Sequence, residues 1–423
     1  MQELKRGDRG AYVYMLQLAL QRSGYLSARK DGIFGPVTEN ALRGFQSAFM
    51  IPVTGTADEK TWRYLNDFIR GYVKYRVKPG DTLFKIAEKN FTTVKSIVTA
   101  NSLKNPDMIE AGQTLVVPFR FDVVPFDVPY TYELTNLLCE GISGRYSFVE
   151  LKESGRSVEG KRLNLFEMGK KGRSVFVNAS HHANEWITTP LVLKFLERYA
   201  ASYANSDSIE GFNASRLFEN SRLYMMPLVN PDGVDLVNGV ADGTYLANAC
   251  KIAEAYPNIR FPEGWKANIE GTDLNLNYPA EWEKAKRIKY GLGFKTPAPR
   301  DFVGENPLSA PESRSVYNIT KSENFVFTIS YHTQGEEIYY TFQGQTPPGG
   351  RFYGEEFARL SGYLLADAPY NSSFAGYKDW VIQDYNVPSY TIEAGKGENP
   401  LPLSELPLMY RDNAGIMAYA LSL

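Results

Sequence analysis

Three residues of the types that bind metal ions lie next to two apolar segments of the sequence. His182 and Glu185 follow the apolar run at 175–179, and their spacing of three places both side chains on one face if a helix begins there. An imidazole nitrogen beside a carboxylate oxygen suits Zn²⁺. His332 follows a second apolar run, 325–331, which predicts a buried strand. Alone, His332 would be interpreted as a core histidine, but the His182–Glu185 pair favours a third metal ligand at a neighbouring strand end.

An alternation of apolar segments predicts the fold that positions these residues. Strands are expected at 163–168, 175–179, 221–228, 325–330 and 389–392, and helices at 188–199, 311–322, 351–365 and 408–421. This order predicts an α/β catalytic domain, in which helices cover both faces of a mixed sheet. We place this domain at residues 125–423, after a Pro-rich extended linker.

Two smaller domains are expected before the catalytic one. Residues 1–70 show helical apolar spacing and predict an all-α domain, with Thr56 and Glu59 forming a capping-box pattern before its last helix. Residues 73–119 predict a βααβ domain, because strand patterns at both ends enclose two helical ones. Neither small domain has an evident catalytic set, so we assign the chemistry to the third domain.

Bulk properties exclude several classes of function. A length of 423 residues favours two or three domains, and a net charge of −2 argues against nucleic acid or an anionic membrane surface as partner. The first residues lack the apolar segment of a signal peptide, and no uninterrupted apolar run is long enough to cross a membrane. We therefore expect a soluble protein. Cys139 and Cys250 are too few for a disulfide framework, and whether they pair stays open.

The C-terminal motifs, taken in order, resemble the zinc carboxypeptidase family. They are HANEW at 182–186, NPDG at 230–233, GTDLNLN at 271–277, SYH at 330–332, KDW at 378–380 and YTIE at 390–393. The resemblance implies one Zn²⁺ held by His182, Glu185 and His332. It also implies that Glu393 is the general base for the zinc-bound water, with an ordinary strand-end carboxylate as the alternative. Lys266 occupies the position of an oxyanion-stabilising arginine, unless it is a solvated surface lysine.

Departures from the family pattern concern the substrate. Asn275 is followed by leucine where ordinary members have an Asn-Arg pair that holds the C-terminal carboxylate of a peptide. Asn184 replaces an arginine of many members, and Tyr370 lies one residue away from the position of the substrate-side tyrosine. Lys378 falls at the floor of the specificity pocket, where it either favours a carboxylate-bearing side chain or forms a salt bridge with Asp379.

The two small domains resemble modules that bind the bacterial cell wall. The run 4–62 is similar to a helical peptidoglycan-binding domain, with an anonymous helical prodomain as the alternative. The patterns YxVxxGDTLxxIA and GQxLxVP within 75–118 resemble the LysM module, which implies binding of N-acetylglucosamine-containing glycans. Two such modules would raise the effective concentration of the enzyme at peptidoglycan. The whole architecture resembles the γ-D-glutamyl-L-diamino-acid endopeptidases of spore-forming bacteria.

That resemblance implies hydrolysis of the amide between γ-D-glutamate and meso-diaminopimelate in peptidoglycan stem peptides. It also implies a location at the cell wall or in the cytoplasm of a sporulating bacterium. Two alternatives stay open. One is a conventional metallocarboxypeptidase that acts on protein C-termini, and the other is a non-catalytic wall-binding protein.

Overall fold

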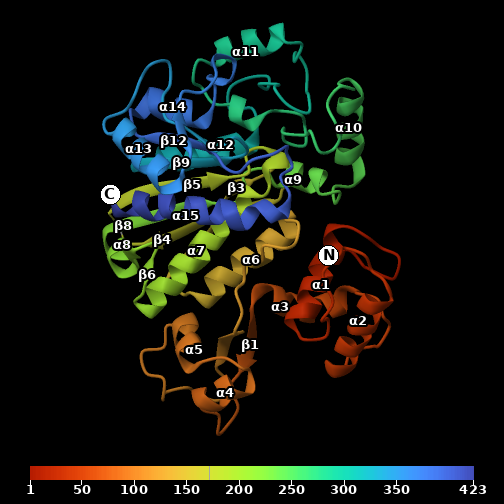
Figure 1. Cartoon of the computed structure of the whole chain (residues 1–423). Coiled ribbons are helices and arrows are strands. Elements are labelled where there is room, and N and C mark those ends of the chain that lie inside the picture. Colours follow the sequence, from red (N-terminus) through yellow and green to blue (C-terminus); the bar gives the residue numbers. More distant parts are fainter. Residues whose placement is uncertain (171) are drawn as a thin grey trace. The chain divides into compact units, whose positions relative to one another are not determined.

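The computed structural model describes residues 1–170 and 172–423 (Figure 1). The chain divides into two compact units, one of residues 1–129 with 133–151 and one of residues 130–132 with 152–423. All residues of the candidate site belong to the second unit. The domain boundaries at 1–70, 73–119 and 125–423 stay predictions. In the described part of the chain, no helix combines the length and the apolar character that a membrane crossing requires.

The first unit contains the expected all-α and βααβ segments. Its elements are α1 (Ala11–Arg22), α2 (Pro36–Ala48), α3 (Glu59–Arg70), β1 (Tyr72–Arg76), α4 (Leu83–Lys89), α5 (Val94–Asn101) and β2 (Thr114–Pro118), with α6 (Tyr132–Arg145) nearly all in the same unit. Strands β1 and β2 pair antiparallel. The predicted capping box at Thr56 and Glu59 is wrong, because Asp58 caps α3 by accepting the N–H of Thr61 at 2.8 Å.

An eight-stranded mixed sheet organises the second unit. Its strands are β3 (Val149–Arg156), β4 (Arg162–Gly169), β5 (Arg173–Ala179), β8 (Ser221–Met226), β9 (Phe325–His332), β10 (Glu337–Tyr339), β11 (Leu364–Ala366) and β12 (Ser389–Glu393). Their order is β11-β10-β12-β9-β5-β8-β4-β3. The central strands β12, β9, β5 and β8 all run parallel. Their carboxyl ends therefore lie along one edge of the sheet, where open α/β folds bind ligands.

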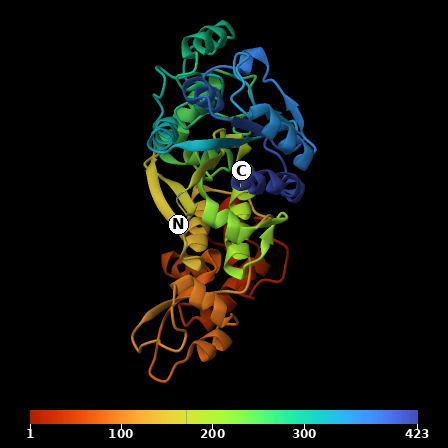
Figure 2. The same cartoon turned by 90° about the vertical axis from the view of Figure 1, so that its left-hand side faces the viewer.

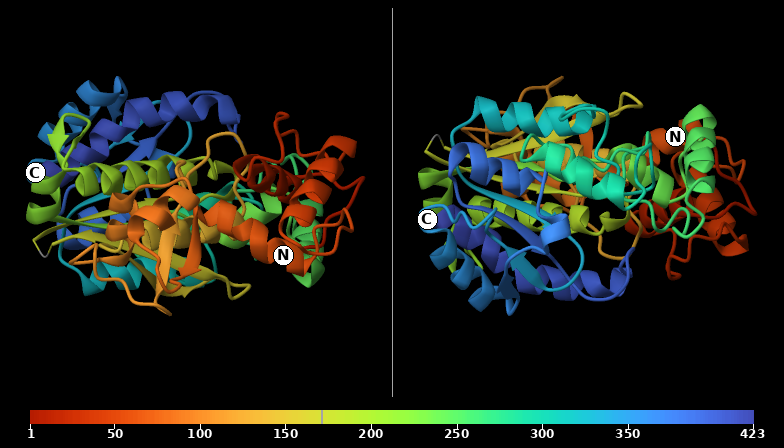
Figure 3. Two further views of the ribbon diagram at one scale, coloured as in Figure 1. Left: turned by 90° about the horizontal axis from the view of Figure 1, so that it is seen from below. Right: turned by 90° about the horizontal axis from the view of Figure 1, so that it is seen from above.

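Helices cover both faces of this sheet, as predicted (Figures 2 and 3). One face packs against α7 (Thr188–Asn205), α13 (Gly350–Ser361) and α15 (Leu406–Ser422), and the other against α12 (Pro311–Ser322) and α14 (Tyr377–Tyr385). On the first face Phe327 lies 5.5 Å from the ring of Phe357. On the second, Phe176 belongs to a buried cluster with Val316 and Trp380. Because side chains alternate along each strand, the two faces form two separate apolar cores.

The remaining elements connect the strands. They are β6 (Ser208–Ile209), β7 (Phe212–Asn213), α8 (Ala214–Asn220), α9 (Pro231–Val237), α10 (Gly243–Glu254), α11 (Trp282–Gly291) and the short 3-10 helices η1 (Ala183–Glu185), η2 (Leu274–Leu276), η3 (Tyr370–Ser372) and η4 (Leu403–Glu405). The helix predicted at 351–365 is too long. Gly362 adopts a left-handed conformation with φ of 79°, which ends α13, and β11 follows.

Candidate active site

A tight corner at the end of β5 positions the first two donors. Ser180 adopts a left-handed conformation with φ of 54°, and its hydroxyl lies 2.9 Å from Thr188 Oγ1 and 2.8 Å from Thr189 Oγ1. Thr188 Oγ1 donates in turn to the carbonyl of Glu185 at 2.8 Å. These buried hydroxyls hold the turn through η1, so that Glu185 folds back against the imidazole of His182 at 2.9 Å.

His332 completes a cluster of three donors at the end of β9. Its Nδ1 lies 2.9 Å from Glu185 Oε2 and 3.2 Å from Nδ1 of His182. One donor atom from each of the three residues lies within 4.8 Å of the others, and all three residues are buried. The structure thus brings together the three predicted ligands from positions 147 and 150 residues apart in the chain.

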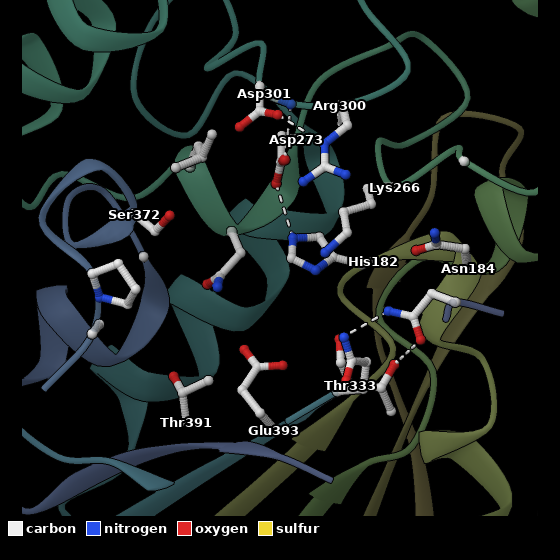
Figure 4. Close-up of a pocket in the computed structure, with 18 of the residues that line it drawn as sticks. His182, Asn184, Lys266, Asp273, Arg300, Asp301, Thr333, Ser372, Thr391 and Glu393 are labelled. Atoms are coloured by element: carbon white, nitrogen blue, oxygen red, sulfur yellow. Dashed lines mark hydrogen bonds and ion pairs between the residues drawn. The ribbon is translucent and has the colours of Figure 1, made fainter. Parts of the chain in front are cut away.

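Asp273 fixes which nitrogen of His182 faces the cluster. Its Oδ1 lies 3.1 Å from Nε2 of His182, and its Oδ2 accepts the backbone N–H of Asp301 at 3.0 Å (Figure 4). Because a carboxylate only accepts, the His182 proton belongs on Nε2, which leaves the lone pair of Nδ1 toward Glu185 and His332. A carboxylate behind a histidine is the usual outer contact of a metal-bound imidazole. This donor set therefore fits Zn²⁺.

The electrostatics of the cluster keep its carboxylate ionised. Burial opposes ionisation of Glu185, but His182 and Lys266 outweigh it and hold the pKa of Glu185 well below its usual range. Burial also lowers the pKa of His332. For His182, the carboxylates of Glu185 and Asp273 outweigh burial and raise its pKa to about 9, so a metal ion would displace a proton from Nδ1 when it binds there. A second histidine next to the cluster, His181, belongs to the core instead, since its Nε2 lies 2.9 Å from the hydroxyl of Tyr278.

Glu393 and Lys266 lie on different walls of the cavity beside the cluster. Glu393 ends β12 and projects into a cavity of about 680 Å³, whereas Lys266 approaches from the other wall and pairs with Glu185 Oε1 at 2.8 Å (Figure 4). Burial, followed by repulsion from Glu185, raises the pKa of Glu393 to about 8. A carboxyl group with a pKa near neutrality can both accept and return a proton. The roles of Glu393 and Lys266 stay predictions.

The same cavity receives three of the four predicted substrate-binding residues: Asn184, Asn275 and Lys378. Asn184 Nδ2 donates to the carbonyl of Glu263 at 3.0 Å, and its buried Oδ1 has no partner among the described residues. Asn275 Oδ1 accepts the N–H of Tyr377 at 3.0 Å, which leaves its amide nitrogen for a ligand. The fourth residue, Tyr370, does not line the cavity. Its side chain is 62% exposed, and its ring lies 5.2 Å from that of Phe374.

Lys378 forms the salt bridge that was one of its two interpretations, and its role in specificity stays a prediction. Its Nζ contacts Asp379 Oδ1 at 2.5 Å and the carbonyl of Thr341 at 2.6 Å, so the salt bridge exists. Both Lys378 and Asp379 nevertheless line the cavity, and their side chains are only 5% and 4% exposed. Leu276, at the position of the clamp arginine, lines the same cavity. The cavity therefore contains a buried charge pair and lacks an arginine at position 276.

Asp273 and Arg300 are among the polar residues of this cavity that sequence reasoning missed. Asp273 lies within the GTDLNLN motif, and its position two residues before Asn275 was a usable signal. Arg300 lies in the irregular segment between α11 and α12, where no periodicity connects it to the strand ends. Only the tertiary structure places it near the cluster.

The fold and this site define the class of the protein as an α/β metallopeptidase, and comparisons with known proteins identify the family. Residues 138–415 match the model of the zinc carboxypeptidase family, residues 75–118 that of the LysM domain, and residues 9–65 that of a peptidoglycan binding domain. The chain belongs to the zinc carboxypeptidase family. The family implies zinc, and the two additional domains indicate association with the cell wall.

Individual relatives agree with this assignment. The chain is 38% identical over 295 residues to "Gamma-D-glutamyl-L-diamino acid endopeptidase 1" of Lysinibacillus sphaericus, which covers 70% of this chain and 72% of the relative. It is 39% identical over 280 residues to "Uncharacterized protein YqgT" of Bacillus subtilis (strain 168), covering 65% and 73%. Bovine thrombin-activatable fibrinolysis inhibitor shares the fold, with a TM-score of 0.53 at 19% identity over 70% of this chain and 97% of that one.

Proposed function

We propose that the protein is a zinc-dependent peptidoglycan hydrolase that cleaves the γ-D-glutamyl–meso-diaminopimelate amide of stem peptides. The observation that carries this proposal is the character of the cavity beside the His182–Glu185–His332 cluster. Leu276 removes the group that would hold a free C-terminal carboxylate, while the wall keeps a buried pair of opposite charges. The similarity to an enzyme named for γ-D-glutamyl-L-diamino acid bonds supports the same substrate class.

His182, Glu185 and His332 are the residues proposed to hold one zinc ion. When bound, zinc acts as a Lewis acid and lowers the pKa of a coordinated water toward neutrality. Glu393 is proposed to accept the proton of the attacking water and to deliver it to the leaving amine of diaminopimelate. Its raised pKa, about 8, suits both directions of this transfer near neutral pH.

Three other cavity residues are proposed to orient the scissile amide. Lys266 Nζ, on the wall opposite Glu393, would stabilise the negative charge that develops on the amide oxygen. Asn184 offers its Oδ1 as an acceptor, and Asn275 offers its Nδ2 as a donor. Tyr370 lies on η3, next to cavity residues Pro369 and Ser372. We propose that it contacts the substrate, for which its exposed ring must turn toward the cavity.

The Lys378–Asp379 pair is proposed to recognise the diaminopimelate side chain. That side chain ends in both an ammonium and a carboxylate, so it needs one acceptor and one cationic donor side by side. Lys378 uses two contacts within the protein, to Thr341 and Asp379, and an ammonium has three donors. Lys378 and Asp379 are already buried, so most of the cost of removing water from these two charges is met on folding. Binding of a zwitterionic side chain then adds little further desolvation cost at the protein.

The N-terminal part is proposed to bring the enzyme to its polymer. We propose a peptidoglycan-binding domain at 1–70, a LysM domain at 73–119 that binds N-acetylglucosamine-containing glycan, and a catalytic domain at 125–423. Phe84 and Phe91 of the LysM part are 69% and 85% exposed, which suits stacking on sugar rings. The proposed location is the cell wall, or the cytoplasm of a sporulating bacterium during wall contact or recycling.

Mass spectrometry of defined stem peptides tests the proposed reaction. L-Ala-γ-D-Glu-meso-diaminopimelate and its D-Ala-extended form are incubated with zinc-loaded enzyme, with the Glu393→Gln variant as control. We expect the wild type alone to release L-Ala-D-Glu from both. Intact stem peptides, together with loss of C-terminal residues from ordinary peptides, would instead identify a conventional carboxypeptidase. No turnover of any peptide by zinc-loaded protein would identify a wall-binding protein without activity.

A further inference from the structure

Arg300 presents a cationic fork to the wall of the cavity that carries Lys266. It lies beside Asp273 and Lys266 in the site, and its side chain is 42% exposed (Figure 4). The guanidinium Nε donates to Asp301 Oδ2 at 2.8 Å. Its two terminal nitrogens make no hydrogen bond to the described part of the chain. The proposed mechanism assigns this group no task.

Arg300 is held in place by Asp301, whose negative charge also pairs with Lys289. The other oxygen of Asp301 accepts from Lys289 Nζ at 2.5 Å, and the backbone N–H of Asp301 is fixed by Asp273. Asp301 therefore lies between two cations, Lys289 and Arg300. The charge of Lys266 is paired with Glu185. The two open terminal nitrogens of its guanidinium make Arg300 a site for a carboxylate.

The position of Glu393 determines which part of a substrate reaches Arg300. Because Glu393 protonates the leaving amine, the amine side of the scissile bond lies toward Glu393 and β12. The acyl side then extends toward the opposite wall, where Lys266 and Arg300 lie (Figure 4). In an α-linked peptide the acyl residue has no free α-carboxylate, because that group forms the scissile amide. In a γ-linked glutamyl residue the α-carboxylate is free and is separated from the scissile carbonyl only by short methylene spacers.

We propose that Arg300 binds this free α-carboxylate and thereby selects γ-glutamyl over α-linked acyl groups. A guanidinium fork matches a carboxylate in two parallel hydrogen bonds, which a lysine cannot supply. The inference rests on the proposed function and adds the acyl-side determinant to it. In this arrangement Arg300 recognises the acyl residue, which precedes the scissile bond. Lys378 and Asp379 recognise the residue on the amine side.

A pair of substrates that differ in one group tests the assignment. The tripeptide L-Ala-γ-D-Glu-meso-diaminopimelate is compared with the form whose glutamyl α-carboxylate is an amide, in wild type, Arg300→Gln, Arg300→Lys and Arg351→Gln. Arg351 is the matched control, because it lies on α13 and is 74% exposed. We expect Arg300→Gln to lower kcat/KM on the free acid by about 10–100-fold and to change turnover of the amide about twofold or less.

Arg300→Lys should recover part of this loss, and Arg351→Gln should change neither substrate. Equal losses of kcat/KM on the acid and on the amide would overturn the role of Arg300. If the wild type cleaves neither substrate, the proposed function fails. The role of Arg300 is then tested by binding alone. Calorimetry measures the affinity of both tripeptides for the Glu393→Gln protein and for the Glu393→Gln, Arg300→Gln double variant. Binding that favours the acid only when Arg300 is present supports it, and any other binding pattern rejects it.

Discussion

Glu393 and His332 are paired residues at the ends of two adjacent parallel strands, β12 and β9. In a parallel pair such residues lie side by side at the strand spacing of about 4.8 Å. His332 turns into the donor cluster, and Glu393 faces the cavity next to it. The ladder of the sheet thus sets the distance between the proposed general base and the proposed metal, and no flexible loop intervenes.

Replacing Glu393 with glutamine should separate catalysis from metal binding. Glutamine keeps the shape of the side chain but cannot accept a proton, so kcat on the stem tripeptide should fall by about 10²–10⁴-fold. Because the three donors are untouched, zinc content by mass spectrometry of the intact protein should stay at the wild-type ratio. A variant that retains more than a tenth of the activity would exclude Glu393 as the base.

Replacing Asp273 with asparagine should weaken metal binding through His182. One carboxylate accepts from both His182 Nε2 and the Asp301 backbone, and an amide has only one oxygen for these two donors. We expect zinc affinity, measured by competition with a chromophoric chelator, to fall about 10–100-fold. Asp384→Asn is the control, because Asp384 accepts from Trp380 outside the cluster. Unchanged affinity in Asp273→Asn would show that the His182 tautomer needs no carboxylate.

Removing the charge at Lys378 should reduce the preference for diaminopimelate. With Lys378→Met, kcat/KM on the diaminopimelate peptide should fall by about tenfold or more, and a peptide with lysine in its place should be affected less. Asp379 would then be buried without its partner, so the single variant should also unfold more easily. The double variant Lys378→Met with Asp379→Asn removes both charges and controls for this loss of stability. Equal losses on both peptides would reject the assignment.

The buried carboxyl of Glu312 should make stability fall with rising pH. Burial raises its pKa from 4.5 to about 7, so the folded state binds more protons than the unfolded state between these values. The free energy of unfolding therefore decreases as pH rises from about 4.5 to 7 and has lost this contribution above 7. Urea titrations give the free energy of unfolding at pH 5 and at pH 8. The decrease between these two pH values should be smaller by about 1–3 kcal/mol in Glu312→Gln than in wild type. The same pH difference in both proteins would contradict the prediction.

The sequence predicted most of the fold because each strand has a strong local signal. Predicted strands at 175–179 and 325–330 correspond to β5 and β9, and the family motifs give the three donors. The end of α13 was missed, since Gly362 stops the helix by its backbone conformation while the apolar spacing continues. Arg300 was missed for another reason. Its place in the cavity depends on how the segment between α11 and α12 folds over the sheet, which local patterns do not encode.

The donor-bearing strands β5 and β9, with β12 beside them, lie in the middle of the sheet and are buried on both faces. We expect such strands to exchange their amide hydrogens most slowly, through opening of the whole domain. The charged groups proposed to choose the substrate, Arg300 and Lys378, instead lie in a loop and in the first turn of α14. If these two residues have the proposed roles, substitutions there would alter substrate choice and leave the strands that carry the donors unchanged. The donor cluster and the proposed specificity groups therefore lie on parts of the fold with different local stability.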